Sequence, residues 1–154
     1  MIDNTETSPI ILRRPIVLDT GPLGKLAHPR PNADIAAWFE QALSSPIAIY
    51  LPEIADYEVR RNFLLEGLTS SLHILDGLKS KILYLPLTTP IMGDAARLWA
   101  EARKRGKPTG DKKELDGDVI LAAQALAVGG LVVTDNIGHL AQFVEALLWQ
   151  ETVI

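Results

Sequence analysis

The chain of 154 residues contains no cysteine. This absence excludes disulfide scaffolds, thiolate-ligated zinc, iron–sulfur clusters and cysteine nucleophiles. Nothing therefore requires an oxidising compartment, and we expect a cytoplasmic protein. Long uncharged runs are also lacking, because the longest, residues 119–134, is shorter than the roughly 18 residues that indicate a membrane span and contains Gly129 and Gly130. We expect no membrane association.

The N-terminus lacks the lysines and the apolar run of a signal peptide, since it reads MIDNTETSPI. We predict a disordered tail over residues 1–12 and one domain over residues 13–154, because a chain of this length usually forms a single compact unit. An excess of positive charge is missing too. The formal net charge of −4 argues against nucleic-acid binding over a broad surface but leaves room for a local basic surface.

Short apolar runs alternate with helical patterns along the chain. The runs predict strands at residues 16–18, 47–51, 82–85 and 131–133, and the patterns predict helices at 33–43, 52–65, 71–80, 92–104, 118–128 and 137–148. A polar loop, GKPTGDKKELDG, precedes Asp118, which we expect to cap its helix. Hairpin signals are absent, so the pattern predicts a three-layer α/β sandwich with a central parallel sheet. Ligand sites in such sheets lie at the carboxyl ends of the strands.

Two acidic residues are expected at this edge. Asp19 follows its strand directly, although it could also be a turn residue that accepts a hydrogen bond from the backbone after it. Glu58 lies between Ile54 and Leu65 on the apolar face of its predicted helix, about a turn and a half from the start. It can project towards the same edge, or it can form a salt bridge with one of the arginines at 60 and 61.

Two further acids bracket the uncharged stretch of a helix and a strand. The strand must run back antiparallel to the preceding helix, so Asp118 at the start of the helix comes close to Asp135 and Asn136 at the end of the strand. Carboxylates that converge in this way repel one another unless a cation is present. Oxygen ligands without cysteine or a nearby histidine favour Mg²⁺ or Mn²⁺ over zinc. Such sites commonly activate water and hydrolyse phosphodiesters.

At this point the sequence resembles a known family. The segments IVLDTGPL (16–23), PEIADYEVRR (52–61), GDVILAAQAL (117–126) and VVTDN (132–136) resemble the four acidic motifs of PIN-domain ribonucleases, in the same order. The resemblance covers nearly the whole chain from Ile16. It is especially close to the VapC toxin branch, in which a basic loop like RKRGKP at 103–108 precedes the third acid.

The resemblance implies a Mg²⁺- or Mn²⁺-dependent endoribonuclease of one domain, often a homodimer and frequently paired with a small antitoxin. By position, Asp19, Glu58 and Asp118 match the metal-binding acids, and Thr20 matches a hydroxyl residue that supports them.

The fourth acidic position stays open. The family often has Thr-x-Asp or Thr-x-Asn there, which matches Thr134 and Asn136, while this chain also offers Asp135. Asp116 is a further candidate for this position or for a supporting role beside it. If Asn136 is the ligand, a second metal should bind weakly, because an amide carries less negative charge than a carboxylate.

Basic residues are concentrated before the third acid. Lys107, Lys112 and Lys113 could contact RNA phosphates and give affinity without base specificity. Arg103, Lys104 and Arg105 could equally be the solvated end of a helix. The sequence also allows a catalytically inactive PIN-like module that binds RNA or an antitoxin.

Overall fold

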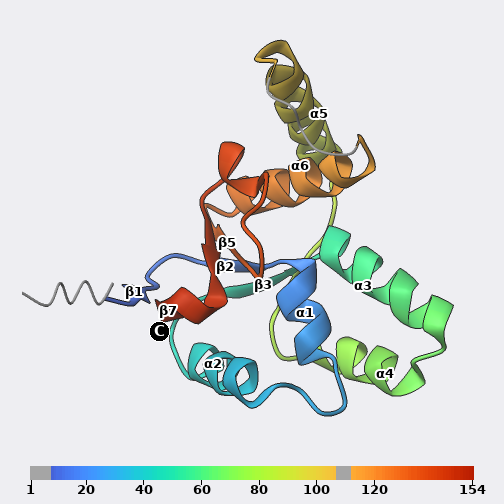
Figure 1. Cartoon of the computed structure of the whole chain (residues 1–154), viewed down its shortest axis with the longest axis vertical. Coiled ribbons are helices and arrows are strands. Elements are labelled where there is room, and N and C mark those ends of the chain that lie inside the picture. Colours follow the sequence, from blue (N-terminus) through green and yellow to red (C-terminus); the bar gives the residue numbers. More distant parts are fainter. Residues whose placement is uncertain (1–7, 107–111) are drawn as a thin grey trace, which may run out of the picture.

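The computed structural model describes residues 8–106 and 112–154. Five parallel strands form the central sheet in the order β4-β3-β2-β5-β6. Figure 1 labels the three central strands β3, β2 and β5. The strands are β2 (Ile16–Leu18), β3 (Ile49–Pro52), β4 (Leu83–Leu85), β5 (Leu131–Thr134) and β6 (Ala146–Leu148). The predicted parallel sheet is therefore confirmed.

Helices cover both faces of this sheet. The first face carries α1 (Thr20–Leu26), α2 (Ala33–Leu43), α3 (Glu53–Glu66) and α4 (Thr69–Leu78), and the second carries α5 (Thr89–Lys104), α6 (Lys112–Ala127) and the 3₁₀ turn η1 (Leu140–Gln142) (Figure 1). The three-layer α/β sandwich is thus confirmed. Within the described ranges, none of the helices combines the length and apolar character needed to cross a membrane.

The period of two along the central strands builds the two cores. Ile16 and Leu18 face the first set of helices while Val17 faces the second, and all three are fully buried. On the neighbouring strand, Val132 and Val133 divide between the two cores in the same way. Each fully buried side chain of this size contributes roughly 1.5–3 kcal/mol of transfer free energy, so burial on both faces holds the strands that position the site.

The strand order reverses between β2 and β5, where the chain has gone out to β3 and β4 and then returned. Leu18 pairs with Val133, and the amide of Asp19 donates to the Val133 carbonyl at 3.0 Å. The carboxyl ends of the two strands therefore lie side by side. Such a reversal point is where open α/β sheets place their ligands.

The C-terminal helix predicted over residues 137–148 is wrong. The segment instead forms η1, the edge strand β6, a second 3₁₀ turn η2 (Trp149–Glu151) and the strand β7 (Thr152–Val153). The free edge of β5 offers backbone partners, and the amide of Val132 donates to the Glu145 carbonyl at 2.9 Å. This tertiary pairing overrides the local helical pattern.

The segment expected to be a tail, residues 1–12, contributes its last residues to the fold. The strand β1 (Ile10–Ile11) pairs in parallel with β7, and Leu12 is only 3% exposed. Arg14 then forms a salt bridge with Glu145. The boundary predicted at residue 13 therefore falls inside an ordered segment.

One helix was not predicted, and another begins earlier than predicted. Helix α1 begins directly after Asp19, where Gly21 and Pro22 favoured a loop; Pro22 lies in the first turn, where a missing N–H costs nothing. Helix α6 begins at Lys112, inside the predicted polar loop, because lysine, glutamate and leucine are good helix formers. Asp118 is therefore inside α6, and its predicted capping role is wrong.

A buried acid anchors α3, the helix that carries Glu58. Asp56 is 5% exposed, and its two carboxylate oxygens contact Arg60 at 2.9 Å and Lys79 at 2.8 Å. Arg60 also reaches Asp76 of α4 at 2.7 Å. The network ties α3 to α4 and to the residue that follows α4.

We expect Asp56→Ala to lower the free energy of unfolding by about 2–3 kcal/mol, because it removes the buried carboxylate that joins Lys79 to Arg60 and leaves Arg60 with Asp76 alone. Asp94→Ala is the matched control, since Asp94 forms only an exposed pair with Arg97. That change should cost less than about 0.5 kcal/mol. Urea unfolding of both variants measures the difference. Equal losses would show that the buried network adds nothing beyond an exposed pair.

Candidate metal-dependent nuclease site

A pocket of about 780 Å³ opens at the carboxyl ends of β3, β2 and β5. Every acidic position singled out in the sequence lines it, together with the two threonines and the asparagine expected to support them: Asp19, Thr20, Glu58, Asp116, Asp118, Thr134, Asp135 and Asn136. Residues not singled out also contribute, among them Tyr57 and His139. The four motifs thus converge on one volume.

Asp19 has a partner for each carboxylate oxygen. As the N-cap of α1, it accepts a hydrogen bond from the Thr20 amide at 2.7 Å, so the turn role foreseen for it is real. Its other oxygen lies 2.8 Å from the Thr134 hydroxyl, which donates to it. The pKa of Asp19 is raised, mainly because the carboxyl is buried and also because of the charge of Asp135. The two hydrogen bonds lower the pKa and offset part of this rise.

Glu58 reaches the pocket from the second turn of α3. The predicted apolar face does not continue along the helix, because Leu65 is 85% exposed. Glu58 is instead half-buried at the pocket wall, 3.9 Å from the guanidinium of Arg61. Burial raises its pKa, the Arg61 charge opposes this, and the charges of Asp19 and Asp118 raise it further. Glu58 is therefore affected by the charges of two carboxylates that belong to other elements.

Two glycines leave room for carboxylates. A Cβ at position 117 would lie 3.0 Å from Oε1 of Glu58, and a Cβ at position 21 would lie 2.4 Å from Oδ2 of Asp135. Gly117 precedes Asp118 in α6, so a side chain at position 117 would press on the carboxylate of Glu58 and displace it from its present position. The glycines in GDVIL and DTGPL thus have a steric role that the sequence alone did not reveal.

The two candidates for the fourth position differ in their contacts. Asp135 accepts a hydrogen bond from the indole nitrogen of Trp149 at 2.7 Å. It also forms a salt bridge with Lys25 at 3.1 Å. Asn136 is exposed, and its backbone amide donates to the Thr134 hydroxyl at 3.1 Å. The sequence reasoning missed Lys25, because α1 was not predicted, and Trp149, because the segment just before it was predicted to be a helix.

The acids, threonines and asparagine of the pocket offer carboxylate, hydroxyl and amide oxygens, which suit a hard divalent cation. Contrary to the expectation of no nearby histidine, His139 lines the same pocket. The mutual charge effects on Glu58 are those of a site that a cation would neutralise. As the side chains stand, no three Asp, Glu, His or Cys residues among 8–106 and 112–154 have the arrangement that holds an ion. Asp19 and Asp135 instead contact protein donors.

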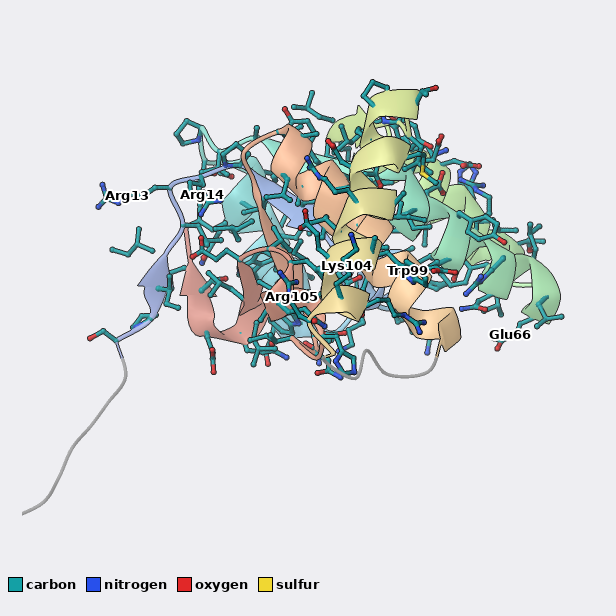
Figure 2. All side chains as sticks on the ribbon, turned by 90° about the horizontal axis from the view of Figure 1, so that it is seen from above. Arg13, Arg14, Glu66, Trp99, Lys104 and Arg105 are labelled. Atoms are coloured by element: carbon teal, nitrogen blue, oxygen red, sulfur yellow. The ribbon has the colours of Figure 1, made fainter. Side chains whose placement is uncertain are left out.

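The basic residues are only partly described. Lys107 lies outside the described residues, and Lys112 and Lys113 begin α6 with side chains that are not described. Arg103 and Lys104 lie in the last turn of α5, where their positive charges interact favourably with the helix dipole. Figure 2 labels Lys104. Of the two arginines after Glu58, the first belongs to the Asp56 network and Arg61 lines the pocket.

Comparison with solved structures finds the same fold in FitAB and VapBC proteins. FitAcB from Neisseria gonorrhoeae is 25% identical, with a TM-score of 0.67 over 88% of this chain and 98% of the matched chain. VapBC2 from Rickettsia felis, bound to a DNA fragment from their promoter, is 17% identical, with a TM-score of 0.72 over 91% and 99%. VapBC-1 from nontypeable Haemophilus influenzae is 19% identical, with a TM-score of 0.66 over 92% and 99%.

No model of a known protein family and no curated protein matches the sequence. The structural matches span almost the full length of the neighbouring chains. The resemblance to VapC-type PIN domains, predicted from four short motifs, is therefore confirmed at the level of the fold.

Proposed function

We propose that this protein is a divalent-metal-dependent endoribonuclease that hydrolyses RNA phosphodiesters. The observation that carries the proposal is the convergence of Asp19, Glu58 and Asp118 from three separate elements on one pocket, with the pKa of Glu58 raised in part by the other two. The VapC-like fold supports it. The site would work in the cytoplasm on a substrate that carries phosphate.

Asp19, Glu58 and Asp118 would hold Mg²⁺ or Mn²⁺, and the loop at 134–136 would complete the site. The bound metal would lower the pKa of a water and neutralise charge on the phosphate. The protein's own part is to position the carboxylates: Thr134 donates to Asp19, and Gly117 leaves room for the carboxylate of Glu58. Asp116 and Thr20 line the same pocket and support these groups.

The substrate must approach an acidic pocket, so it needs cations at the rim. Arg61 is one of these, since its exposed guanidinium lines the pocket beside Glu58. Lys107, Lys112 and Lys113 are the further candidates, because they precede Asp118 in the sequence. Point charges of this kind contact phosphates and supply affinity that is independent of sequence.

Incubating the purified protein with a labelled structured RNA tests the proposal. We expect internal cleavage with Mg²⁺ or Mn²⁺, none with EDTA, and none for Asp19→Asn with either metal. Binding of the RNA without cleavage under all conditions would favour the alternative function, an inactive PIN-like module. Cleavage that persists in EDTA would contradict a metal-dependent mechanism.

Neutralising Lys107, Lys112 and Lys113 together should weaken RNA binding for all sequences and reduce the slope of log affinity against log salt. The reason is counterion release, which contributes roughly 0.7–0.9 to the slope for each phosphate contact. Fluorescence anisotropy across a salt series measures it. The control neutralises Arg13, Lys81 and Arg97, which are exposed and do not line the pocket. A slope as steep as that of the wild type would show that the three lysines make no phosphate contacts.

The matched VapBC and FitAB proteins are toxin–antitoxin complexes, some of them bound to DNA. By analogy, we propose a small antitoxin as the partner of this chain and a homodimer as its assembly. Co-expression with a small adjacent reading frame, followed by size-exclusion chromatography with light scattering, tests both. A monomer without any bound partner would contradict them.

A further inference from the structure

Both carboxylate oxygens of Asp135 are occupied by protein donors. Oδ1 accepts from the indole nitrogen of Trp149 at 2.7 Å, and Oδ2 lies 3.1 Å from the ammonium of Lys25. Oδ2 also packs so closely against α1 that a Cβ at Gly21 would come within 2.4 Å of it. Each oxygen of Asp135 therefore already has a protein donor, and a metal would have to share one of these oxygens with Trp149 or Lys25 or displace that donor.

The donor on the C-terminal side is itself fixed. Trp149 is 8% exposed and packs against Trp38 with ring centroids 6.4 Å apart. Trp38 donates to the Thr152 hydroxyl at 2.9 Å, so η2 and β7 are tied to α2. If Asp135 turned towards a metal, the indole N–H of Trp149 would lose its acceptor in a nearly buried position.

The neighbours of Asp135 reach the metal site directly. On one side, the Thr134 hydroxyl donates to Asp19 at 2.8 Å. On the other side, the backbone amide of Asn136 donates to the same hydroxyl at 3.1 Å. The backbone that Asp135 anchors therefore carries the group that orients Asp19.

We propose that Asp135 is a positioning residue that clamps the 134–136 loop between Lys25 and Trp149, and that it is not a metal ligand. In this arrangement the loop offers the metal its amide, Asn136, while Asp135 holds Thr134 against Asp19. The inference rests on the proposed metal site and assigns one residue within it. It also gives the C-terminal turn η2 a part in organising the site.

Titration calorimetry with Mn²⁺ tests the assignment, using wild type, Asp19→Asn, Asp135→Asn, Trp149→Phe and the double variant at 135 and 149. Trp149→Phe changes no charge, and Trp99→Phe is its control because Trp99 lies outside the pocket on α5 (Figure 2). We expect Asp135→Asn and Trp149→Phe each to weaken Mn²⁺ binding by roughly tenfold, as loss of an outer-shell contact does. Asp19→Asn should abolish binding.

Non-additivity is the decisive readout. Because the two residues act through one hydrogen bond, the double variant should bind Mn²⁺ within about twofold of the weaker single variant. A ligand role predicts otherwise: Asp135→Asn would be as severe as Asp19→Asn, and Trp149→Phe, which releases Oδ1, would bind Mn²⁺ as tightly as wild type or more tightly. Either result overturns the inference.

Two further outcomes keep the test sharp. If Trp149→Phe does not fold, as judged by its melting curve, the comparison of Asp135→Asn with Asp19→Asn decides alone. If the wild type does not bind Mn²⁺, the proposed function itself is contradicted and the role of Asp135 falls with it. If the wild type binds Mn²⁺ and Asp135→Asn loses binding as severely as Asp19→Asn, only the present inference is contradicted.

Discussion

Asp118→Asn should reduce metal-dependent RNA cleavage by more than roughly 100-fold while the melting temperature of the metal-free protein does not fall. The change preserves the shape of the side chain but removes a full negative charge from the proposed metal site, so the loss should exceed the 10- to 100-fold cost typical of outer-shell changes. Asp118 lies inside α6 and does not cap it, so the substitution removes no capping hydrogen bond from the start of the helix.

The matched control is Asp94→Asn, which makes the same substitution at an exposed acid on α5 outside the pocket. Initial rates at saturating Mg²⁺ or Mn²⁺, with melting curves for each variant, separate catalysis from folding. Unchanged cleavage by Asp118→Asn would remove Asp118 from the site. A loss of cleavage accompanied by an equal loss of folded protein would assign it a structural role.

Glu58→Gln should raise the melting temperature of the metal-free protein and remove most of the stabilisation that Mn²⁺ gives to the wild type. Glu58 is half-buried among the charges of Asp19 and Asp118, and the neutral amide avoids that repulsion. A gain on the order of 1 kcal/mol corresponds to roughly 2–4 °C in a domain of this size. Mn²⁺ at about 100 times its Kd stabilises the wild type by about 2.7 kcal/mol, which the variant should lose.

The pH dependence of this difference has a defined sign. The folded state raises the pKa of Glu58 above its ordinary value of 4.5, so the folded protein holds the proton more tightly than the unfolded chain. Stability from this group is fully present below pH 4.5 and is lost as the pH rises through the higher folded pKa. The advantage of Glu58→Gln should therefore be small in acid and reach its full value at neutral pH.

Differential scanning fluorimetry from pH 4 to 8 measures this advantage, with Glu66→Gln as the control on the exposed end of the same helix (Figure 2). A role for Glu58 limited to its salt bridge with Arg61 predicts the opposite sign. Lower metal-free stability of Glu58→Gln, together with an intact Mn²⁺ shift, would make Glu58 a structural residue.

The central strands and several helices could be predicted from the sequence because their signals are local. Uninterrupted apolar runs at 16–18 and 131–133 indicate strands buried on both faces, and the spacing over 33–43 gives α2 its exact bounds. The segments that were predicted wrongly owe their structure to partners far away in the sequence. The strands β6 and β7 exist because β5 and β1 pair with them.

Part of the candidate site could likewise be predicted from the sequence, and part of it could not. Topology alone brings Asp19, Glu58 and Asp118 together, because each follows from its place at the carboxyl edge of a parallel sheet. The contacts of Asp135 could not be predicted, since Trp149 and Lys25 reach it only through the folded C-terminal turn and an unrecognised helix. The buried acid on α3 was hidden as well, because a sequence does not show that Asp56 will find two cations.

Cleavage of RNA in water enriched in ¹⁸O, followed by mass spectrometry of the new ends, tests the central claim most directly. A metal-activated water places one solvent oxygen on the new phosphate end, whereas attack by the neighbouring 2′-hydroxyl gives a cyclic phosphate without solvent oxygen. The account predicts Mg²⁺- or Mn²⁺-dependent products that carry ¹⁸O and no cyclic phosphate. Cyclic ends, or the absence of any cleavage by the wild type with either metal, would contradict it.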